Sequence, residues 1–319
     1  MQMKMKKLLL LAIGLIVLGA AVFAAAMFSV QWDFARLNNA GMETATYPVD
    51  APFENIVFAD DTADITVLPS SQGEASLTTK VYSGVTYTVD VTDGVLNVSR
   101  CDSRKWYQKL LTFENEQVYL YLPEKEYGKI TVNASTSDIE ISEGFTFGEI
   151  DIFINTGDVV CLSSAVSQMK IRTTTGDISV AGVSVGSLSL SVRTGDLSLY
   201  GIACEGAIEI TCTTADTELT DVRSASLTST GDTGDIELEK VIVSGEMKIK
   251  RTTGDVSLEG CDGGEIYIRT NTGDVEGTLL SAKSFLVQTN TGDTRIPPDG
   301  NGGRCEIITD TGDILIFVE

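Results

Sequence analysis

The 319-residue chain contains no histidine. Nucleophilic catalysis of the Ser-His-Asp or Cys-His type and imidazole metal sites are therefore excluded. Positive charge is also scarce, because 45 Asp and Glu residues outnumber 23 Lys and Arg residues and give a formal net charge of −22. Proteins bind nucleic acid through clustered Lys and Arg, so we expect no nucleic-acid partner. With 43% hydrophobic and 21% charged residues, the chain can nevertheless bury a core.

Residues 8–30 form an apolar run without charge or proline. As a helix this run is about 34 Å long, enough to cross the hydrocarbon core of a membrane. Three lysines precede it, so the positive-inside rule places residues 1–7 in the cytoplasm and the rest of the chain outside the cell membrane. A signal peptide cleaved near Ala24-Ala25-Ala26 is the alternative, but the run is longer than a usual signal-peptide core. We therefore expect a single-pass anchor, followed by a juxtamembrane linker over residues 31–53.

The rest of the chain is an internal repeat marked by Thr-Gly-Asp. The marker aspartates recur every 19 or 20 residues and are Asp138, Asp158, Asp177, Asp196, Asp216, Asp235, Asp255, Asp274, Asp293 and Asp313. Asp64, in Thr62-Ala63-Asp64, begins the same series upstream. A period this short is typical of the coils of a solenoid rather than of a chain of domains.

Each coil alternates apolar and polar residues around its aspartate. Met169 and Ile171 stand eight and six residues before Asp177, for example, and Ile178 and Val180 stand one and three residues after it. A period of two predicts short β-strands with one buried face, stacked in register from coil to coil. The predicted fold is all-β: a single-stranded β-solenoid, like a parallel β-helix, over residues 54–319, after one N-terminal transmembrane helix.

The repeat is interrupted between its first coil and Ile130. Residues 75–100 alternate strongly around Asp93-Gly94, which predicts two strands joined by a tight turn. We expect the whole insertion, residues 73–128, to cover the N-terminal end of the core, where an uncapped solenoid exposes strand edges. Trp106 lies in a local basic cluster within the insertion, and Trp106 with Arg104 is a candidate binding site.

The Thr-Gly-Asp motif has a structural interpretation. Each aspartate would accept hydrogen bonds from N–H groups of its own turn or from the threonine hydroxyl, as in Thr175-Gly176-Asp177 and Thr253-Gly254-Asp255. The middle residue is replaced in three copies, by Ala63, Ser137 and Ala215, and never by Asn. We therefore expect a corner that admits only a small side chain, rather than a residue with positive φ.

The same file of aspartates also has a functional interpretation, as a calcium site. Its carboxylates would come from Asp158, Asp177, Asp196, Asp216, Asp235, Asp255, Asp274 and Asp293. One carboxylate per coil gives few ligands per ion, and the spacing differs from that of calcium-binding β-rolls. We therefore favour the structural turn and expect no cofactor.

Two further features bear on chemistry. Among the six cysteines, Cys161, Cys261 and Cys305 occupy core columns, which predicts buried thiols, whereas a disulfide is predicted between the nearby Cys204 and Cys212. The coils vary in length by one residue, and apart from residues 297–303 they leave no loop that could wall a cleft. We therefore expect no carbohydrate-active enzyme.

The lysine-led tail, the apolar span, Trp32-Asp33 and the Thr-Gly-Asp strand repeats together resemble the bacterial putative-adhesin family of unknown function. The likeness runs from Lys4 to Glu319. It implies a cell-surface protein of β-strand repeats, with some members encoded beside envelope-stress regulators, and it implies no reaction and no catalytic residues. We expect a non-enzymatic, membrane-anchored scaffold whose flat faces bind a protein, a glycan or an envelope polymer.

Two alternatives stay open. The chain stops at residues 314–317 with no evident capping element after them, so this end could pair with another solenoid and form a homo-oligomer. An accessory role in envelope-stress signalling is the other.

Overall fold

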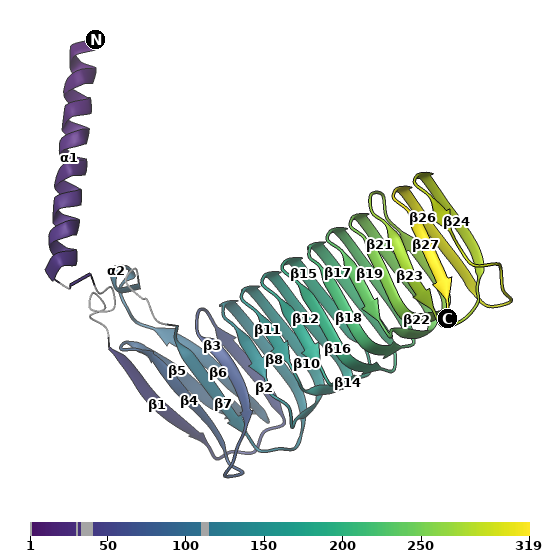
Figure 1. The fold of residues 1–319 in the computed structure, drawn as a ribbon. Helices are drawn as coiled ribbons and strands as arrows, with labels where there is room; N and C mark the ends of the chain where they lie inside the picture. The colour runs from purple at the N-terminus through teal and green to yellow at the C-terminus, as the bar shows by residue number, and fades with distance from the viewer. Residues whose placement is uncertain (1, 30, 33–40, 110–114) are drawn as a thin grey trace.

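The structure is a computed structural model that describes residues 2–29, 31–32, 41–109 and 115–319. It contains an N-terminal helix, a small antiparallel cap and a long rod of parallel β-coils (Figure 1). The predicted all-β solenoid is therefore confirmed. Helix α1 (Gln2–Ser29) includes the apolar stretch Ala12–Ser29 and is long and apolar enough to cross a membrane.

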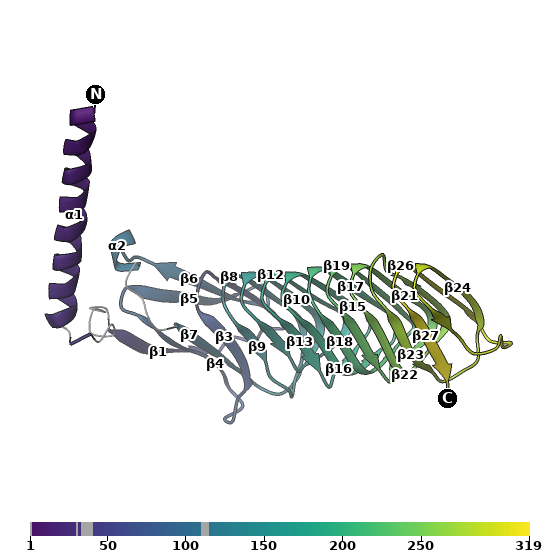
Figure 2. The same ribbon diagram turned by 45° about the horizontal axis from the view of Figure 1, so that its top comes forward.

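The rod has two long walls of parallel strands, which Figure 2 shows from a second direction. The first wall precedes the aspartates and runs in the order β8 (Glu126–Thr136), β10 (Thr146–Thr156), β12 (Ser164–Thr175), β15 (Leu188–Thr194), β17 (Ala207–Thr214), β19 (Ser226–Thr233), β21 (Ile242–Thr253), β22 (Val256–Arg269), β26 (Arg304–Thr311) and β24 (Ser284–Thr291). The second wall follows the aspartates and runs in the order β9 (Ile139–Ile141), β11 (Val159–Cys161), β13 (Ile178–Ala181), β16 (Leu197–Cys204), β18 (Thr217–Ser224), β20 (Ile236–Glu239), the first part of β22, β23 (Val275–Leu279), β27 (Ile314–Val318) and β25 (Thr294–Arg295). The short β14 (Ser184–Val185) pairs with β12 and β16.

The core lies between these walls and is built from the predicted columns. Ile150 pairs with Ile130 on one side and with Met169 on the other, and all three side chains are buried. Because every coil repeats this register, the inward side chains form continuous files of aliphatic residues along the rod.

An antiparallel cap closes the N-terminal end. The first coil, β2 (Asn55–Asp60) and β3 (Asp64–Pro69), is followed by β4 (Ala75–Tyr82), β5 (Val85–Thr92), β6 (Val95–Asp102), α2 (Trp106–Lys109) and β7 (Gln117–Leu122). Strands β6 and β7 lie beside β2 and β3 and continue the two walls, while β5 and β4 pair antiparallel to them. Asp93 and Gly94, with φ of 51° and 76°, join β5 to β6, which confirms the predicted tight turn.

The range expected to be a linker contains a strand. β1 (Met42–Val49) pairs antiparallel with β4 over its whole length, from Met42 opposite Tyr82 to Val49 opposite Ala75. Residues 42–49 therefore extend the cap, a role that the sequence analysis did not assign to them.

The C-terminal end differs from the predicted sequential stacking. β26 and β27 lie inside the rod, between the coil of β22 and β23 and the coil of β24 and β25, although they follow both in sequence. Cys305, Ile307, Ile314 and Ile316 are fully buried there, whereas the inward residues of β24 are only partly buried. The expectation that residues 314–317 end the rod uncovered is thus corrected: the less apolar coil covers the more apolar one.

A buried lysine fixes this order. Lys283, in the outermost coil, reaches past the inserted coil, and its Nζ lies 2.6 Å from Asp262 Oδ1 and 2.6 Å from the carbonyl oxygen of Gly263. Gly303 of the inserted coil accepts a hydrogen bond from the Ser284 N–H on one side and closely approaches the Gly264 carbonyl oxygen on the other, and it has no side chain to fill the space between the two coils. At the same edge, the Asp299 carboxylate accepts a hydrogen bond of 2.9 Å from the Phe285 N–H.

Substitution of Lys283 tests whether its contacts with Asp262 and Gly263 hold the outermost coil in place. Lys283→Met keeps the aliphatic stem but leaves the partly buried Asp262 without its ammonium partner, so we expect the outermost coil to lose about 2 kcal/mol of stability. Hydrogen exchange of residues 284–295 should accelerate accordingly, whereas Lys240→Met, which removes an exposed ion pair with Glu239, should leave that exchange unchanged. Equal exchange rates of residues 284–295 in wild type and in Lys283→Met would contradict this role of Lys283.

Candidate functional site

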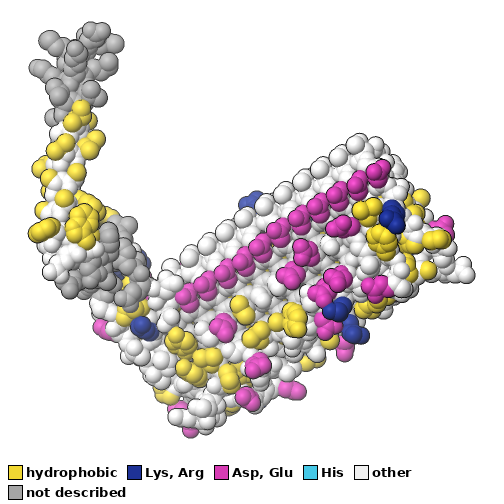
Figure 3. All heavy atoms as spheres, in the orientation of Figure 1, with side chains coloured by type: hydrophobic (Ala, Val, Ile, Leu, Met, Phe, Trp, Pro, Cys, Tyr) yellow, Lys and Arg dark blue, Asp and Glu magenta, His cyan; other side chains and the backbone are white. Residues whose placement is uncertain are grey.

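The aspartates form a hydrogen-bonded ladder along one edge of the rod. The Oδ1 atom of each accepts the backbone N–H of the next aspartate in the stack, at 2.7–3.3 Å. The order of the stack is Asp64, Asp138, Asp158, Asp177, Asp196, Asp216, Asp235, Asp255, Asp274, Asp313 and Asp293, so the ladder passes through the inserted coil. The acidic row is visible as an unbroken magenta line in Figure 3.

The ladder corrects the predicted hydrogen bonding of the turn. Each carboxylate bonds to the neighbouring coil, rather than to its own turn; Asp177 Oδ1, for example, accepts from Asp196 N at 2.7 Å. A hydrogen bond to a charged acceptor contributes about 1.5–3 kcal/mol. Neighbouring carboxylates about 4.8 Å apart repel by roughly 0.9 kcal/mol in water, so the ladder offsets its own repulsion.

The middle residue of the motif must be small and, where it is glycine, also adopts a positive φ, whereas the sequence analysis expected only the first of these two features. A Cβ on Gly176 would lie 2.0 Å from the carbonyl oxygen of Gly157, so the expected close approach between coils is confirmed. The rejection of positive φ was wrong, because the motif glycines have φ between 123° and 151°. The three substituted copies, all within the described residues, do not share this φ, so their backbone takes another path through the corner.

The ladder does not assemble a cation site among the described residues. No group of three or more Cys, Asp or Glu side chains there is placed to hold a metal ion. A groove of about 240 Å³ beside the ladder is lined by carboxylates of three successive coils, which are Asp196, Asp216, Glu218, Asp235 and Glu237.

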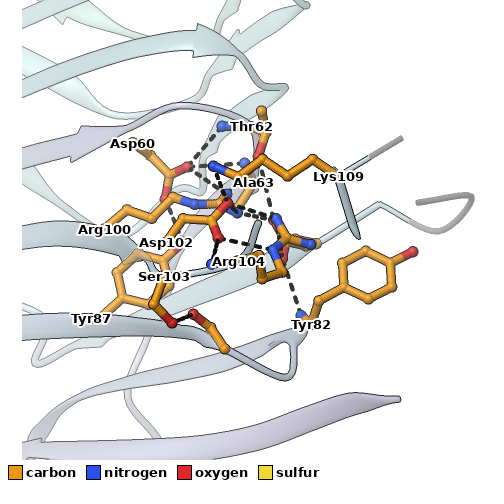
Figure 4. Close-up of polar contacts among 12 residues, drawn as sticks. Asp60, Thr62, Ala63, Tyr82, Tyr87, Arg100, Asp102, Ser103, Arg104 and Lys109 are labelled. Carbon is orange, nitrogen blue, oxygen red and sulfur yellow. Dashed lines mark hydrogen bonds and ion pairs between the residues drawn. The ribbon is translucent and has the colours of Figure 1, made fainter. Parts of the chain in front are cut away.

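A second cluster of charged side chains ties the cap to the first coil (Figure 4). Arg100, from β6, lies 3.4 Å from Asp60 of β2 and also pairs with Glu116, and all three side chains are at most 4% exposed. Asp60 in turn accepts hydrogen bonds from the N–H groups of Thr62 and Ala63, at 2.9 and 3.0 Å. The cluster therefore caps the first turn of the repeat.

Arg104 belongs to this buried cluster. Its Nη2 lies 2.8 Å from Asp102 Oδ2, and its guanidinium carbon lies 5.1 Å from the ring centre of Tyr82. Burial alone would raise the pKa of Asp102, but hydrogen bonds from Arg104 and Lys109 outweigh it and hold that pKa well below its usual range.

Trp106, by contrast, is 74% exposed on α2. The structure therefore separates the two residues of the candidate binding site: Arg104 is engaged in the cap, and Trp106 faces outward. Sequence reasoning missed Asp60 and Glu116, whose charges balance the arginines. The sequence did contain an indication of both residues, because each is an acidic residue at or directly beside the end of a strand that is otherwise mostly apolar.

All six cysteines lie within the described part of the chain, and all are free thiols there. Cys204 and Cys212, predicted to be bridged, are both free: their thiols donate weak hydrogen bonds to different strands, Cys204 to Ala207 O and Cys212 to Thr230 O. The predicted burial of Cys161, Cys261 and Cys305 is confirmed. Burial raises the pKa of Cys161 and of Cys305 to about 12, so these thiols are unreactive at neutral pH. Cys101 is exposed.

Fold and ladder together define a parallel β-solenoid with an antiparallel cap. The chain belongs to the Toastrack DUF4097 family, a family of unknown function whose model matches residues 53–259 and 218–318. This confirms the family resemblance seen in the sequence. A comparison with curated proteins finds no match.

Several solved structures are similar to the chain at low identity. One from Bacteroides fragilis NCTC 9343, named a putative adhesin, is 14% identical, covers 86% of this chain and 97% of its own, and has a TM-score of 0.40. One from Parabacteroides distasonis ATCC 8503, named a putative lipid binding protein, is 11% identical, covers 88% and 98%, and has a TM-score of 0.44. A putative adhesin from Parabacteroides merdae ATCC 43184 is 16% identical, covers 88% and 98%, and has a TM-score of 0.40.

Substitutions of Asp177 test the ladder. Asp177→Ala leaves the Asp196 N–H without its acceptor and should lower the free energy of unfolding by about 1–2 kcal/mol. Asp177→Asn keeps an acceptor oxygen and removes repulsion from two neighbours, so it should change stability by less than about 0.5 kcal/mol. Thermal unfolding of the full chain in detergent measures both. Asp232→Ala, at an exposed aspartate outside the ladder, is the control, and equal losses for Asp177→Ala and Asp232→Ala would contradict the ladder.

Proposed function

We propose that the protein is a non-enzymatic scaffold, anchored in the cell membrane by α1, with its rod exposed outside the cytoplasm. The observation that carries this proposal is a membrane-length apolar helix followed by a rod whose turns repeat one hydrogen-bonded ladder of aspartates. The walls of the rod present mixed charges, including Lys170, Arg172, Glu237 and Arg269, over a long and regular surface. Such a surface suits an extended partner, namely a protein, a glycan or an envelope polymer.

Self-assembly through the C-terminal end has less support than the sequence suggested. Residues 314 and 315 pair with β23 on one side and with β25 on the other, so the strand on which that alternative was based lies within the rod.

The natural thiol at Cys101 tests the topology. In wall-stripped cells, a membrane-impermeant maleimide should label Cys101 without lysis, because the side chain is exposed while the other five cysteines are buried. Cys101→Ser should abolish labelling, and a cysteine introduced at Lys4 in that background should react only after lysis. Labelling of Cys101 only after lysis would contradict the proposed orientation. Co-sedimentation of the detergent-solubilised chain with purified cell-wall sacculi then tests an envelope polymer as the partner.

A further inference from the structure

Two exposed tryptophans mark the membrane-proximal part of the chain. Trp32 and Trp106 are the only tryptophans in the sequence, and they are 59% and 74% exposed. Trp32 directly follows the end of α1, whereas Trp106 lies 74 residues further along the chain, on α2. Indole rings are amphipathic and are enriched where an apolar phase meets water, so the position of these two exposed rings relative to α1 is informative.

The hydrogen bonds of the cap bring Trp106 to the edge where the chain arrives from α1. The Ser83 N–H donates to the carbonyl oxygen of Gly41, and the Ser103 N–H donates to that of Gly84, each at 3.0 Å. Gly41, the turn at residues 83–84 and Ser103 therefore share one edge of the cap. Trp106 follows Ser103 by three residues, and Figures 1 and 2 show α2 at this edge.

The length of the intervening chain keeps this edge near the membrane. Gly41 follows Ser29 by twelve residues, which span at most about 40 Å when fully extended. If α1 crosses the bilayer, Gly41 and the edge it shares with α2 thus lie within about 40 Å of the outer end of α1, a range that includes contact with the lipid surface. The rod continues from the cap toward β24, at the far end of the structure (Figure 1).

The side chains at this edge match a lipid headgroup region. Lys105 and Lys109 flank Trp106, and both are exposed. The Lys109 ammonium also lies 3.1 Å from Asp102 Oδ2, so its charge is shared with the cap, although the Lys109 side chain as a whole is about half exposed. An amphipathic indole between ammonium groups is the combination that membrane interfaces favour, since the ring enters the headgroup layer while the cations meet lipid phosphates.

We propose that the edge formed by Lys105, Trp106 and Lys109 docks on the lipid surface of the membrane in which α1 is anchored. The inference rests on the proposed anchoring and adds a second point of attachment. Two attachment points, α1 and Trp106, fix the direction in which the rod leaves the membrane, which a single anchor does not fix. Arg104 takes no part, because its guanidinium is buried in the cap.

Single-tryptophan fluorescence tests this docking. Trp32→Phe leaves Trp106 as the sole tryptophan of the full-length chain, which is reconstituted into vesicles of phosphatidylcholine and phosphatidylglycerol with or without bromine near the headgroup end of the acyl chains. Docking predicts a blue-shifted emission and a loss of roughly half of the Trp106 intensity in brominated vesicles. Equal intensity in the two kinds of vesicle would overturn the proposal.

Three further variants separate the causes. Trp106→Phe leaves Trp32 as the sole tryptophan, which reports on α1. If Trp32 is quenched and Trp106 is not, α1 is anchored and the docking proposal is wrong. If neither tryptophan is quenched, the proposed anchoring by α1 is itself wrong. Tyr200→Trp in the background without both tryptophans places an indole on the rod at a residue that is 61% exposed, and it should not be quenched. Lys105→Glu should reduce the quenching of Trp106, and unchanged quenching would contradict the contact with lipid phosphates.

Discussion

Because the coils repeat, their aspartate carboxylates are stacked next to one another and repel, and the stability of the rod depends on an interaction that offsets this repulsion. Each Thr-Gly-Asp turn brings a carboxylate within about 5 Å of the carboxylates in the adjacent coils. The backbone N–H of each aspartate donates a hydrogen bond to the carboxylate of the preceding aspartate in the stack. The carboxylates that repel one another therefore also accept the hydrogen bonds that join the coils. Close approach of the backbones is required for this bond, which explains why glycine dominates the middle position.

The two ends of the rod solve a different problem, since a solenoid exposes strand edges and core side chains wherever it stops. At the N-terminal end, an antiparallel cap continues both walls and is tied to the first turn by buried ion pairs through Arg100. At the C-terminal end, the chain reverses the order of its last two coils, so that the coil with partly buried residues faces outward. Both ends also contain ion pairs of buried cations, those of Arg100 with Asp60 and Glu116 and that of Lys283 with Asp262.

The sequence alone was sufficient for the walls of the rod, because alternation around the aspartates placed Ile150, Met169 and Ile266 in one buried column. The sequence did not predict that the last two coils exchange their order in the stack, although one feature of the sequence indicates it. From Asp138 onward, the position ten residues before each aspartate holds a small residue, except Lys283 before Asp293; the small residues are Gly128, Gly148, Ser167, Gly186, Gly206, Ala225, Gly245, Gly264 and Gly303. A lysine cannot occupy a tightly packed inner corner, so the coil that carries it belongs at the end.

Other features required three-dimensional contacts. Ser229 and Thr217 are polar residues in apolar columns and accept hydrogen bonds from the buried guanidinium of Arg251, at 3.1 and 3.2 Å, a pairing that spans two coils and leaves no local trace in the sequence. The direction of the aspartate hydrogen bonds likewise depends on the neighbouring coil. Arg104 is held in the cap by Asp102 and Glu116, at 2.8 and 3.7 Å, whereas Trp106 stays exposed, and the sequence did not indicate that these two neighbours would be separated in this way.

The central claim is that backbone amides, and not bound cations, hold the file of aspartates together. Thermal unfolding of the full-length chain in detergent, first with EDTA and then with millimolar Ca²⁺, tests it most directly, because a ligand that binds only the folded state raises the unfolding temperature. The amide ladder predicts the same transition in both solutions. A transition several degrees higher in Ca²⁺ than in EDTA would show that the carboxylates require a cation and would contradict this account.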